Sequence, residues 1–230
     1  MKISIIIPCY NEEKTIELIV DKILNIENLE KEIIIVDDYS LDGSRDIIKK
    51  IEKNNQNLKY FFHEENKGKG AALQTGFKEA TGDIVLIQDA DLEYDPQDYS
   101  KLLEPFKNTD ADVVYGSRFL GGSYVRLHFF WHYLANKILT LLTNIVTNLN
   151  MSDMETGYKV FKRSVIQSIH LKENSFGIEP EMTVKLAKKK YRFYEVPISY
   201  RGRSYDEGKK ISLKDAFIAI YCIFKYRFFD

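Results

Sequence analysis

The chain has 230 residues, 44% of them hydrophobic, and its 33 basic and 34 acidic side chains leave a formal net charge of −1. With only 12 glycines and 5 prolines, this composition excludes a disordered or fibrous protein and fits one large domain, or one domain with an appendage. The near-neutral total hides a division: residues 1–184 hold 21 basic and 29 acidic side chains, a balance of −8, and residues 185–230 hold 12 and 5, a balance of +7.

Strand and helix patterns alternate through the first 115 residues. Short β-rich runs predict strands at 3–7, 32–36, 58–62, 83–87 and 112–115, and apolar residues at helical spacing predict helices at 16–24, 42–51, 70–80 and 98–107. Strands that alternate with helices of this length build βαβ units. We therefore expect an α/β fold with a mostly parallel central sheet flanked by helices.

The pattern changes after residue 120. It predicts a long amphipathic helix at 127–149, strands at 158–161 and 193–200, and a helix at 179–189. No stretch reaches the roughly 20 apolar residues that a bilayer span requires. We expect one domain over residues 1–210 and a C-terminal amphipathic segment, 211–230, that associates with a membrane surface.

Cys9 and Cys222 lie at opposite ends of the chain with no metal-type spacing. Neither a disulfide framework nor a zinc site is indicated, and reducing, intracellular surroundings fit best.

Polar side chains gather after four of the predicted strands. They are Tyr10, Asn11 and Glu12; Asp37 and Asp38; Asp89 and Asp91; and Ser117 and Arg118. Parallel sheets bind ligands at the carboxyl ends of their strands. Any one of these groups fits a plain turn equally well, but four on one edge favour a binding site.

Asp89 and Asp91 form the most informative pair. Two carboxylates at i and i+2, directly after a buried strand, can converge on a hard cation such as Mg²⁺ or Mn²⁺, which completes its shell with substrate phosphates. The alternative for an isolated pair is a solvated turn before Asp95 and Pro96.

Five segments in order resemble family 2 glycosyltransferases with the GT-A fold, over about residues 1–200. These segments are Pro8–Glu13, Val36–Ser44, Asn66–Ala71, Asp89–Asp91 and Gly116–Arg118. The resemblance implies an inverting transferase that uses Mg²⁺ or Mn²⁺ and a nucleotide sugar. It assigns nucleotide contacts to Pro8, Tyr10, Glu12, Asp38, Lys67 and Gly70, and the metal to Asp89 and the catalytic Asp91, with Glu93 as a further ligand.

Within that family, the later motifs resemble the dolichol-phosphate mannose synthase and polyprenyl-phosphate glycosyltransferase group. The resemblance implies that Arg118, as a catalytic residue, and Arg126 meet phosphate, and that a loop carrying Arg201, Arg203 and Lys209 closes over the diphosphate. Asp153 in Asp-x-x-Thr-Gly-Tyr would lie beside the acceptor. It could act as a catalytic base, orient the cations that bind phosphate, or merely cap a helix.

The acceptor separates two enzyme hypotheses. A phosphate monoester, with a second pKa of about 6, needs cations rather than a strong base, whereas a saccharide hydroxyl needs a carboxylate to take its proton. We expect transfer of mannose or glucose, from GDP-mannose or UDP-glucose, to a polyprenyl phosphate by an enzyme peripheral on the cytoplasmic face of the membrane. A membrane-protein partner or homo-oligomer is compatible with this expectation, and nucleic acid is not expected. The alternatives are transfer to a saccharide hydroxyl and a non-catalytic nucleotide-sugar-binding subunit.

Overall fold

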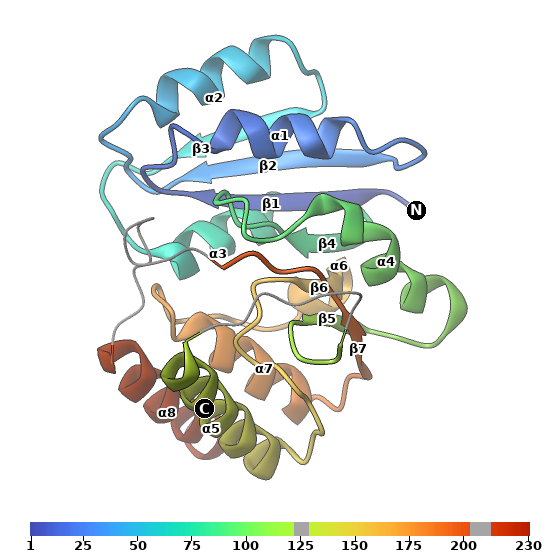
Figure 1. Ribbon diagram of the computed structural model, residues 1–230, viewed down its shortest axis with the longest axis vertical. Helices are drawn as coiled ribbons and strands as arrows, with labels where there is room; N and C mark the ends of the chain where they lie inside the picture. The colour runs from blue at the N-terminus through green and yellow to red at the C-terminus, as the bar shows by residue number, and fades with distance from the viewer. Residues whose placement is uncertain (122–128, 203–212) are drawn as a thin grey trace.

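A computed structural model describes residues 1–121, 129–202 and 213–230. The strands are β1 (Ile3–Cys9), β2 (Lys31–Asp37), β3 (Leu58–Phe62), β4 (Ile84–Ile87), β5 (Val113–Ser117), β6 (Lys159–Lys162) and β7 (Phe193–Pro197). They form one sheet in the order β3-β2-β1-β4-β6-β5-β7 (Figure 1). Neighbouring strands are parallel except at β6, which is antiparallel to β4 and β5. The predicted α/β fold with a mostly parallel sheet is confirmed.

Helices cover both faces of this sheet. They are α1 (Ile16–Leu24), α2 (Ser44–Lys53), α3 (Lys69–Glu79), α4 (Tyr99–Asn108), α5 (Phe130–Thr147), α6 (Arg163–Ile166), α7 (Ile178–Lys188) and α8 (Leu213–Phe228). Helices α1, α2 and α4 share one core with Ile3, Ile5 and Ile7, whereas α3 and α5–α8 share the other with Ile6. Successive strand residues point to opposite faces, and both faces of β1 are covered, so its sequence is apolar apart from Ser4.

The direction of β6 matters for the position of the site. Because β6 runs against its neighbours, its first residue lies at the edge where β4 and β5 end. The segment that enters β6, residues 153–158, is therefore brought to the carboxyl edge of the sheet. Strand β7 ends at Pro197, earlier than predicted, and the chain then reaches the loop after β4 through a bridge between Tyr200 and Tyr94.

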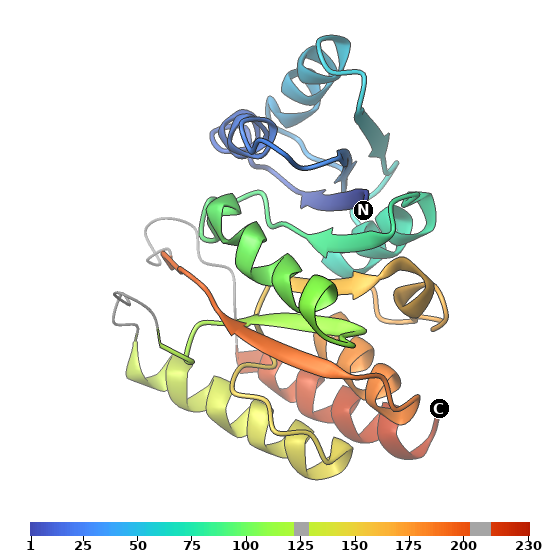
Figure 2. The same ribbon diagram turned by 90° about the vertical axis from the view of Figure 1, so that its right-hand side faces the viewer.

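Helices α5 and α8 lie side by side at the end of the molecule away from α2 (Figures 1 and 2). Helix α8 packs on α5 and α7 through buried Ala219, Ile223 and Tyr226. The outer surface of the pair exposes large apolar side chains, which we call the α5/α8 apolar face: Phe130, Trp131, Leu141, Ile145, Phe217, Tyr221 and Phe228.

None of the helices within the described ranges has the length and apolar character needed to cross a bilayer. The predicted division between residues 210 and 211 falls in 203–212, outside the described residues, and stays a prediction.

Candidate active site

The loops that follow β1 and β2 are tied to each other at the carboxyl edge. The backbone N–H groups of Asn11 and Glu12 donate to the hydroxyls of Ser40 and Ser44 at 2.8 and 2.9 Å. These bonds position two predicted nucleotide contacts that follow β1, Tyr10 on the surface and half-buried Glu12, whereas Pro8 lies within the strand, next to its last residue.

Asp38 organises a third loop. Its carboxylate accepts hydrogen bonds from the N–H groups of Lys67 (2.9 Å) and Gly68 (2.6 Å), and Oδ1 lies 2.7 Å from Nδ1 of His63. Asp38 is buried, so these bonds compensate for its lost hydration. The loop that carries Lys67 therefore lies against the loop after β2, whereas the Lys67 side chain is about half exposed.

Gly70, which was predicted to line the nucleotide pocket, lies against a distant backbone segment. A Cβ atom there would lie 2.4 Å from the carbonyl oxygen of Glu173 and 2.8 Å from the carbonyl carbon of Asn174. The N–H of Ala71 and the amide of Gln74 donate to the same segment. Only glycine permits this contact between the start of α3 and the segment before α7.

The predicted metal residue Asp89 is joined to a lysine that the sequence analysis did not assign. Nζ of Lys69 lies 2.8 Å from Oδ1 of Asp89 and 3.3 Å from Oε1 of Glu179. Burial alone would lower the pKa of Lys69, but the charges of the two carboxylates raise it above its ordinary value. The sequence feature that could have pointed to Lys69 is its place as the second lysine of Lys67-Gly-Lys69-Gly, immediately before a predicted helix.

Asp91 and Glu93 lie in the same loop. Oδ1 of Asp91 accepts the N–H of Glu93 at 3.1 Å, and Oε2 of Glu93 accepts the hydroxyl of Tyr200 at 2.6 Å. Over the described ranges, no three acidic, histidine or cysteine side chains are grouped in a way that could hold a metal ion. Asp89 and Asp91 supply the hard oxygen donors that Mg²⁺ or Mn²⁺ prefers when substrate phosphates complete its shell, so the donor set fits such an ion. The role of Glu93 as a third ligand stays a prediction.

Asp89 is also in contact with the motif that precedes β6. A Cβ on Gly157 would lie 2.3 Å from Oδ2 of Asp89 and 2.8 Å from Cε2 of Tyr94. The N–H of Gly157 donates to the hydroxyl of Tyr94 at 2.8 Å. The glycine thus lets two segments that are far apart in the sequence meet.

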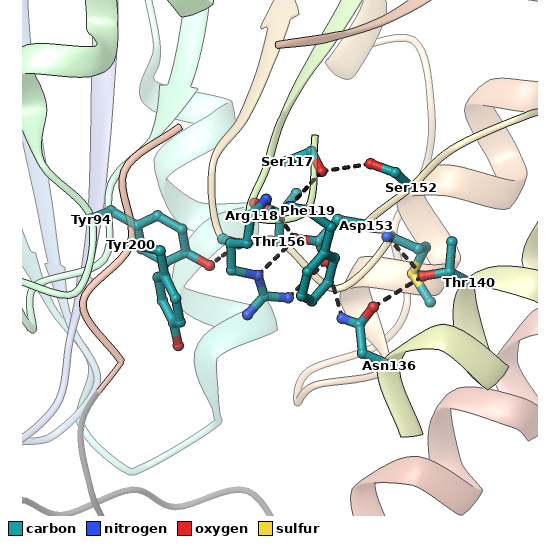
Figure 3. A network of polar contacts seen from close by, with 12 residues as sticks. Tyr94, Ser117, Arg118, Phe119, Asn136, Thr140, Ser152, Asp153, Thr156 and Tyr200 are labelled. Carbon is teal, nitrogen blue, oxygen red and sulfur yellow. Dashed lines mark hydrogen bonds and ion pairs between the residues drawn. The ribbon is translucent and has the colours of Figure 1, made fainter. Parts of the chain in front are cut away.

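Arg118 and Asp153 form a two-pronged ion pair (Figure 3). Nε and Nη2 of Arg118 each donate to the Asp153 carboxylate at 2.7 Å, and the Arg118 N–H donates at 3.1 Å. The amide of Asn136 donates to the same carboxylate at 3.0 Å. The guanidinium also lies over the ring of Tyr200, 5.0 Å from its centroid.

These contacts fix the ionisation of the pair. Burial alone would raise the pKa of Asp153, but the charge and hydrogen bonds of Arg118 lower it below its ordinary value. The Asp153 side chain is completely buried. Asp153 is therefore an ionised partner of Arg118 and a weak proton acceptor at neutral pH.

Several buried polar groups beside this pair lack partners. Among the described residues, Oε1 of Glu155, Oγ1 of Thr156 and Oε2 of Glu179 are buried and accept no hydrogen bond. Burial and the charge of Glu179 raise the pKa of Glu155, and burial lowers the pKa of Lys159. Buried oxygens without donors are unusual and often mark a site that a ligand or water completes.

Of the predicted cationic loop, only its beginning is described. The N–H of Arg201 donates to the carbonyl of Glu93 at 2.9 Å, which anchors the loop beside the predicted metal site. Arg126, Arg203 and Lys209 lie outside the described residues.

Residues 4–169 match the family described as "Glycosyl transferase family 2". The chain belongs to this family.

Curated proteins similar to this chain include a dolichol-phosphate mannosyltransferase of Pyrococcus furiosus, 32% identical over 92% of this chain and 61% of its own length. The chain thus spans less than two thirds of that relative. A UDP-N-acetylglucosamine--dolichyl-phosphate N-acetylglucosaminyltransferase of Methanococcus voltae is 30% identical over 95% of this chain and 93% of the relative. An undecaprenyl-phosphate mannosyltransferase of Micrococcus luteus is 28% identical over 91% and 87%.

Solved structures support the fold of this family 2 glycosyltransferase. Glucosyl-3-phosphoglycerate synthase from Mycobacterium tuberculosis, in complex with Mn²⁺, UDP and phosphoglyceric acid, matches with a TM-score of 0.76 and 21% identity over 100% of this chain and 79% of that one. The same protein has been crystallised with Mg²⁺ and UDP. The predicted GT-A fold is therefore confirmed, and the neighbour with that fold binds a divalent metal and a nucleoside diphosphate.

Proposed function

We propose that this glycosyltransferase moves a hexose from a nucleotide-diphosphate sugar to a polyprenyl phosphate, with inversion and with the help of Mg²⁺ or Mn²⁺. The observation that carries the proposal is the ion pair of Arg118 and Asp153, which supplies a cation for phosphate and no efficient base. All three relatives described above are named for transfer to a lipid phosphate.

The donor binds along the carboxyl edge. Its base and ribose lie against the loops with Tyr10, Glu12 and Asp38, and its diphosphate lies near Asp89 and Asp91. When bound to these two carboxylates, the metal supplies positive charge that stabilises the departing diphosphate. Lys69, 2.8 Å from Asp89, adds a second positive charge within reach of the same phosphates.

The acceptor phosphate supplies the nucleophile. One of its oxygens attacks the anomeric carbon and forms the new C–O bond, while the bond from that carbon to the diphosphate breaks and the nucleoside diphosphate leaves. At pH 7 this phosphate is largely a dianion, so no proton needs to be removed. Arg118, held by Asp153, orients the phosphate for attack.

The lipid tail of such an acceptor stays in the bilayer, so the enzyme works at the membrane surface. The α5/α8 apolar face is the proposed docking surface, and its occupant is the bilayer. Trp131 is 73% exposed, Ile145 is 68% exposed, and α5 also contributes Asn136 to the Arg118 and Asp153 network. Helix α5 therefore contributes residues both to the α5/α8 apolar face and to the Arg118 and Asp153 network that is proposed to bind the acceptor. Peripheral association with the cytoplasmic face remains part of this proposal.

One observation favours a second candidate, transfer to a saccharide hydroxyl. Glu155 has a raised pKa and a buried oxygen without a partner, which are properties of a general base. Substitution of Glu155 by Gln would abolish hydroxyl transfer, whereas transfer to a phosphate dianion would continue.

The decisive experiment offers the full chain a panel of radiolabelled donors, GDP-mannose, UDP-glucose and UDP-N-acetylglucosamine, with Mg²⁺ or Mn²⁺ and undecaprenyl phosphate. Label that enters the organic phase with one donor, and does not with undecaprenol lacking the phosphate, supports the proposal. No organic-phase product from any donor refutes it. Product on saccharide acceptors would favour the second candidate, and no turnover with any acceptor would favour a non-catalytic binding subunit.

A further inference from the structure

Lys69 has two acidic partners, and only one of them belongs to the proposed metal site. It is the first residue of α3, its side chain is 21% exposed, and its Nζ lies 2.8 Å from Asp89 and 3.3 Å from Glu179. Glu179 lies in the first turn of α7 and is nearly buried, and its Oε2 has no hydrogen-bond partner among the described residues. The carboxylate of Glu179 thus has an oxygen that can still accept a hydrogen bond from the ammonium.

An ammonium and a divalent ion cannot use the same oxygen of Asp89 without strong repulsion. Like charges a few ångströms apart in a poorly solvated site repel far more than in water. The Lys69 contact to Oδ1 therefore opposes metal binding at Asp89. A diphosphate at this edge would attract both cations, since each can contact different phosphate oxygens.

We propose that Lys69 couples metal binding to nucleotide binding: its ammonium holds Asp89 until a nucleoside diphosphate binds, and then pairs with Glu179 and the diphosphate and leaves Asp89 to the metal. The proposal rests on the donor site of the proposed function. It makes Lys69 a ligand of the diphosphate, and Glu179 a positioning residue that acts through Lys69.

Glu179 is what makes the movement feasible. A largely buried ammonium that left Asp89 with no other anion nearby would carry a high desolvation cost. Because Glu179 already lies 3.3 Å from Nζ, Lys69 keeps one carboxylate throughout. Its flexible four-carbon stem allows a shift of this size by rotation of side-chain torsions alone.

The test measures Mn²⁺ binding to the full chain by electron paramagnetic resonance of free Mn²⁺, first without nucleotide and then with GDP or UDP. Mn²⁺ that the nucleotide binds in solution is subtracted. We expect Lys69→Met to bind Mn²⁺ about tenfold more tightly than the wild type without nucleotide, and to lose most of the gain that nucleotide gives the wild type. Calorimetry should find weaker GDP or UDP binding to the same variant.

Glu179→Gln, made in two backgrounds, gives the more specific test of the coupling. In the wild-type background it should weaken Mn²⁺ binding without nucleotide, because Lys69 then pairs with Asp89 alone. In the Lys69→Met background it should change Mn²⁺ affinity less than twofold, since a residue that acts only through Lys69 has no effect without it. The matched control is Lys78→Met, which removes an exposed lysine from the same helix and should leave Mn²⁺ affinity unchanged.

Three results would overturn the proposal. They are a Lys69→Met affinity within twofold of the wild type, an equal effect of Lys78→Met, and an effect of Glu179→Gln that is the same in both backgrounds. Circular dichroism of each variant confirms that it is folded. The assay contains no acceptor, so its outcome is independent of the lipid-transfer experiment. A protein with the expected coupling that glycosylates no polyprenyl phosphate would contradict the proposed function alone.

Discussion

Gly157 and Asp89 are in direct contact although 67 residues separate them in the chain, and a single methyl group on Gly157 would lie 2.3 Å from Oδ2 of Asp89. The glycine belongs to the motif that also contains Asp153, the partner of Arg118. The proposed donor and acceptor sides are therefore not independent. The position of the predicted metal ligand depends on the backbone of the acceptor motif.

Gly157→Ala should consequently weaken metal binding. We expect the added methyl group to displace Asp89 and to weaken Mn²⁺ binding about tenfold, with a loss of about 1–3 kcal/mol in the free energy of unfolding from overpacking. Mn²⁺ titration and urea unfolding measure the two effects. Gly43→Ala is the control, since its new Cβ would lie nearest to a flexible carboxylate oxygen of Glu13, at 3.1 Å. Equal Mn²⁺ affinity in the two variants would contradict the coupling.

Asp153→Asn distinguishes a partner of Arg118 from a catalytic base. If Asp153 orients Arg118, the variant should raise the KM for undecaprenyl phosphate with a smaller change in kcat, because one prong of the ion pair is weakened. If Asp153 were the base for a hydroxyl acceptor, kcat should fall by about 100-fold or more. Initial rates over a range of acceptor concentrations separate the two outcomes.

Asp91→Ala should reduce transfer by at least about 100-fold, because the charge of the leaving diphosphate would be stabilised less well. Chelation of the wild type with EDTA should have a similar effect, reversed by added Mn²⁺. Asp46→Asn removes an exposed carboxylate, 88% accessible, and serves as the control for net charge. Full activity after exhaustive chelation would argue against a metal requirement.

The α5/α8 apolar face predicts binding to lipid vesicles. Replacement of both Leu141 and Ile145, which are 58% and 68% exposed, by Glu should lower the fraction that sediments with phosphatidylglycerol vesicles by about tenfold. Leu18→Glu alters an apolar residue on α1 that is 52% exposed and should have little effect. The same loss in both cases would mean that the bilayer does not dock on this face.

Glu32 predicts a pH dependence of stability far from the active site. Burial alone would raise its pKa, but hydrogen bonds from Ser4, Thr81 and Lys2 lower it to about 2. A lowered pKa means that the ionised form stabilises the fold. This contribution is complete above the ordinary glutamate pKa of about 4.3 and is lost as the pH falls from there through about 2.

Glu32→Gln should therefore destabilise the protein by about 2 kcal/mol at pH 7, and the difference from the wild type should shrink below pH 4. Urea unfolding at pH 7, 4 and 3 measures it. Glu30→Gln, an exposed neighbour, should change the free energy of unfolding little at any of these pH values. A constant difference from pH 7 to pH 3 would contradict the assignment to Glu32 ionisation.

Much of the fold could be predicted from local sequence patterns. The apolar run of β1 and the helical spacing of Ile16, Ile19 and Ile23 reflect burial that local sequence already encodes. The clusters after β1, β2, β4 and β5 were predicted to share an edge. The parallel pairing of β1 with β2 and β4, and the antiparallel pairing of β6 with both β4 and β5, place them there. The order of the strands follows from none of these patterns, because it depends on contacts between distant segments.

The same reason explains what was missed at the site. Lys69 could be assigned only after α7 brought Glu179 beside it, and the two residues are more than 100 positions apart. The contact of Tyr94 with Tyr200 likewise joins two loops that have no common sequence signal. The sequence allowed three roles for Asp153, a catalytic base, a residue that orients cations and a helix cap, because an aspartate fits all of them. Its complete burial against Arg118 favours the role of orienting that cation, and the Asp153→Asn variant tests this role.

The antiparallel strand β6 also determines when the site can form during synthesis. Strand β5 is hydrogen-bonded to β6 and β7, both of which follow it in the chain. A ribosome-bound chain that ends before Lys159 thus lacks both of the strands to which β5 is hydrogen-bonded in the finished sheet. Arg118, one residue beyond that strand, lies over Tyr200, and Asp89 and Lys69 contact Gly157 and Glu179, so both sides of the site require chain that follows β5.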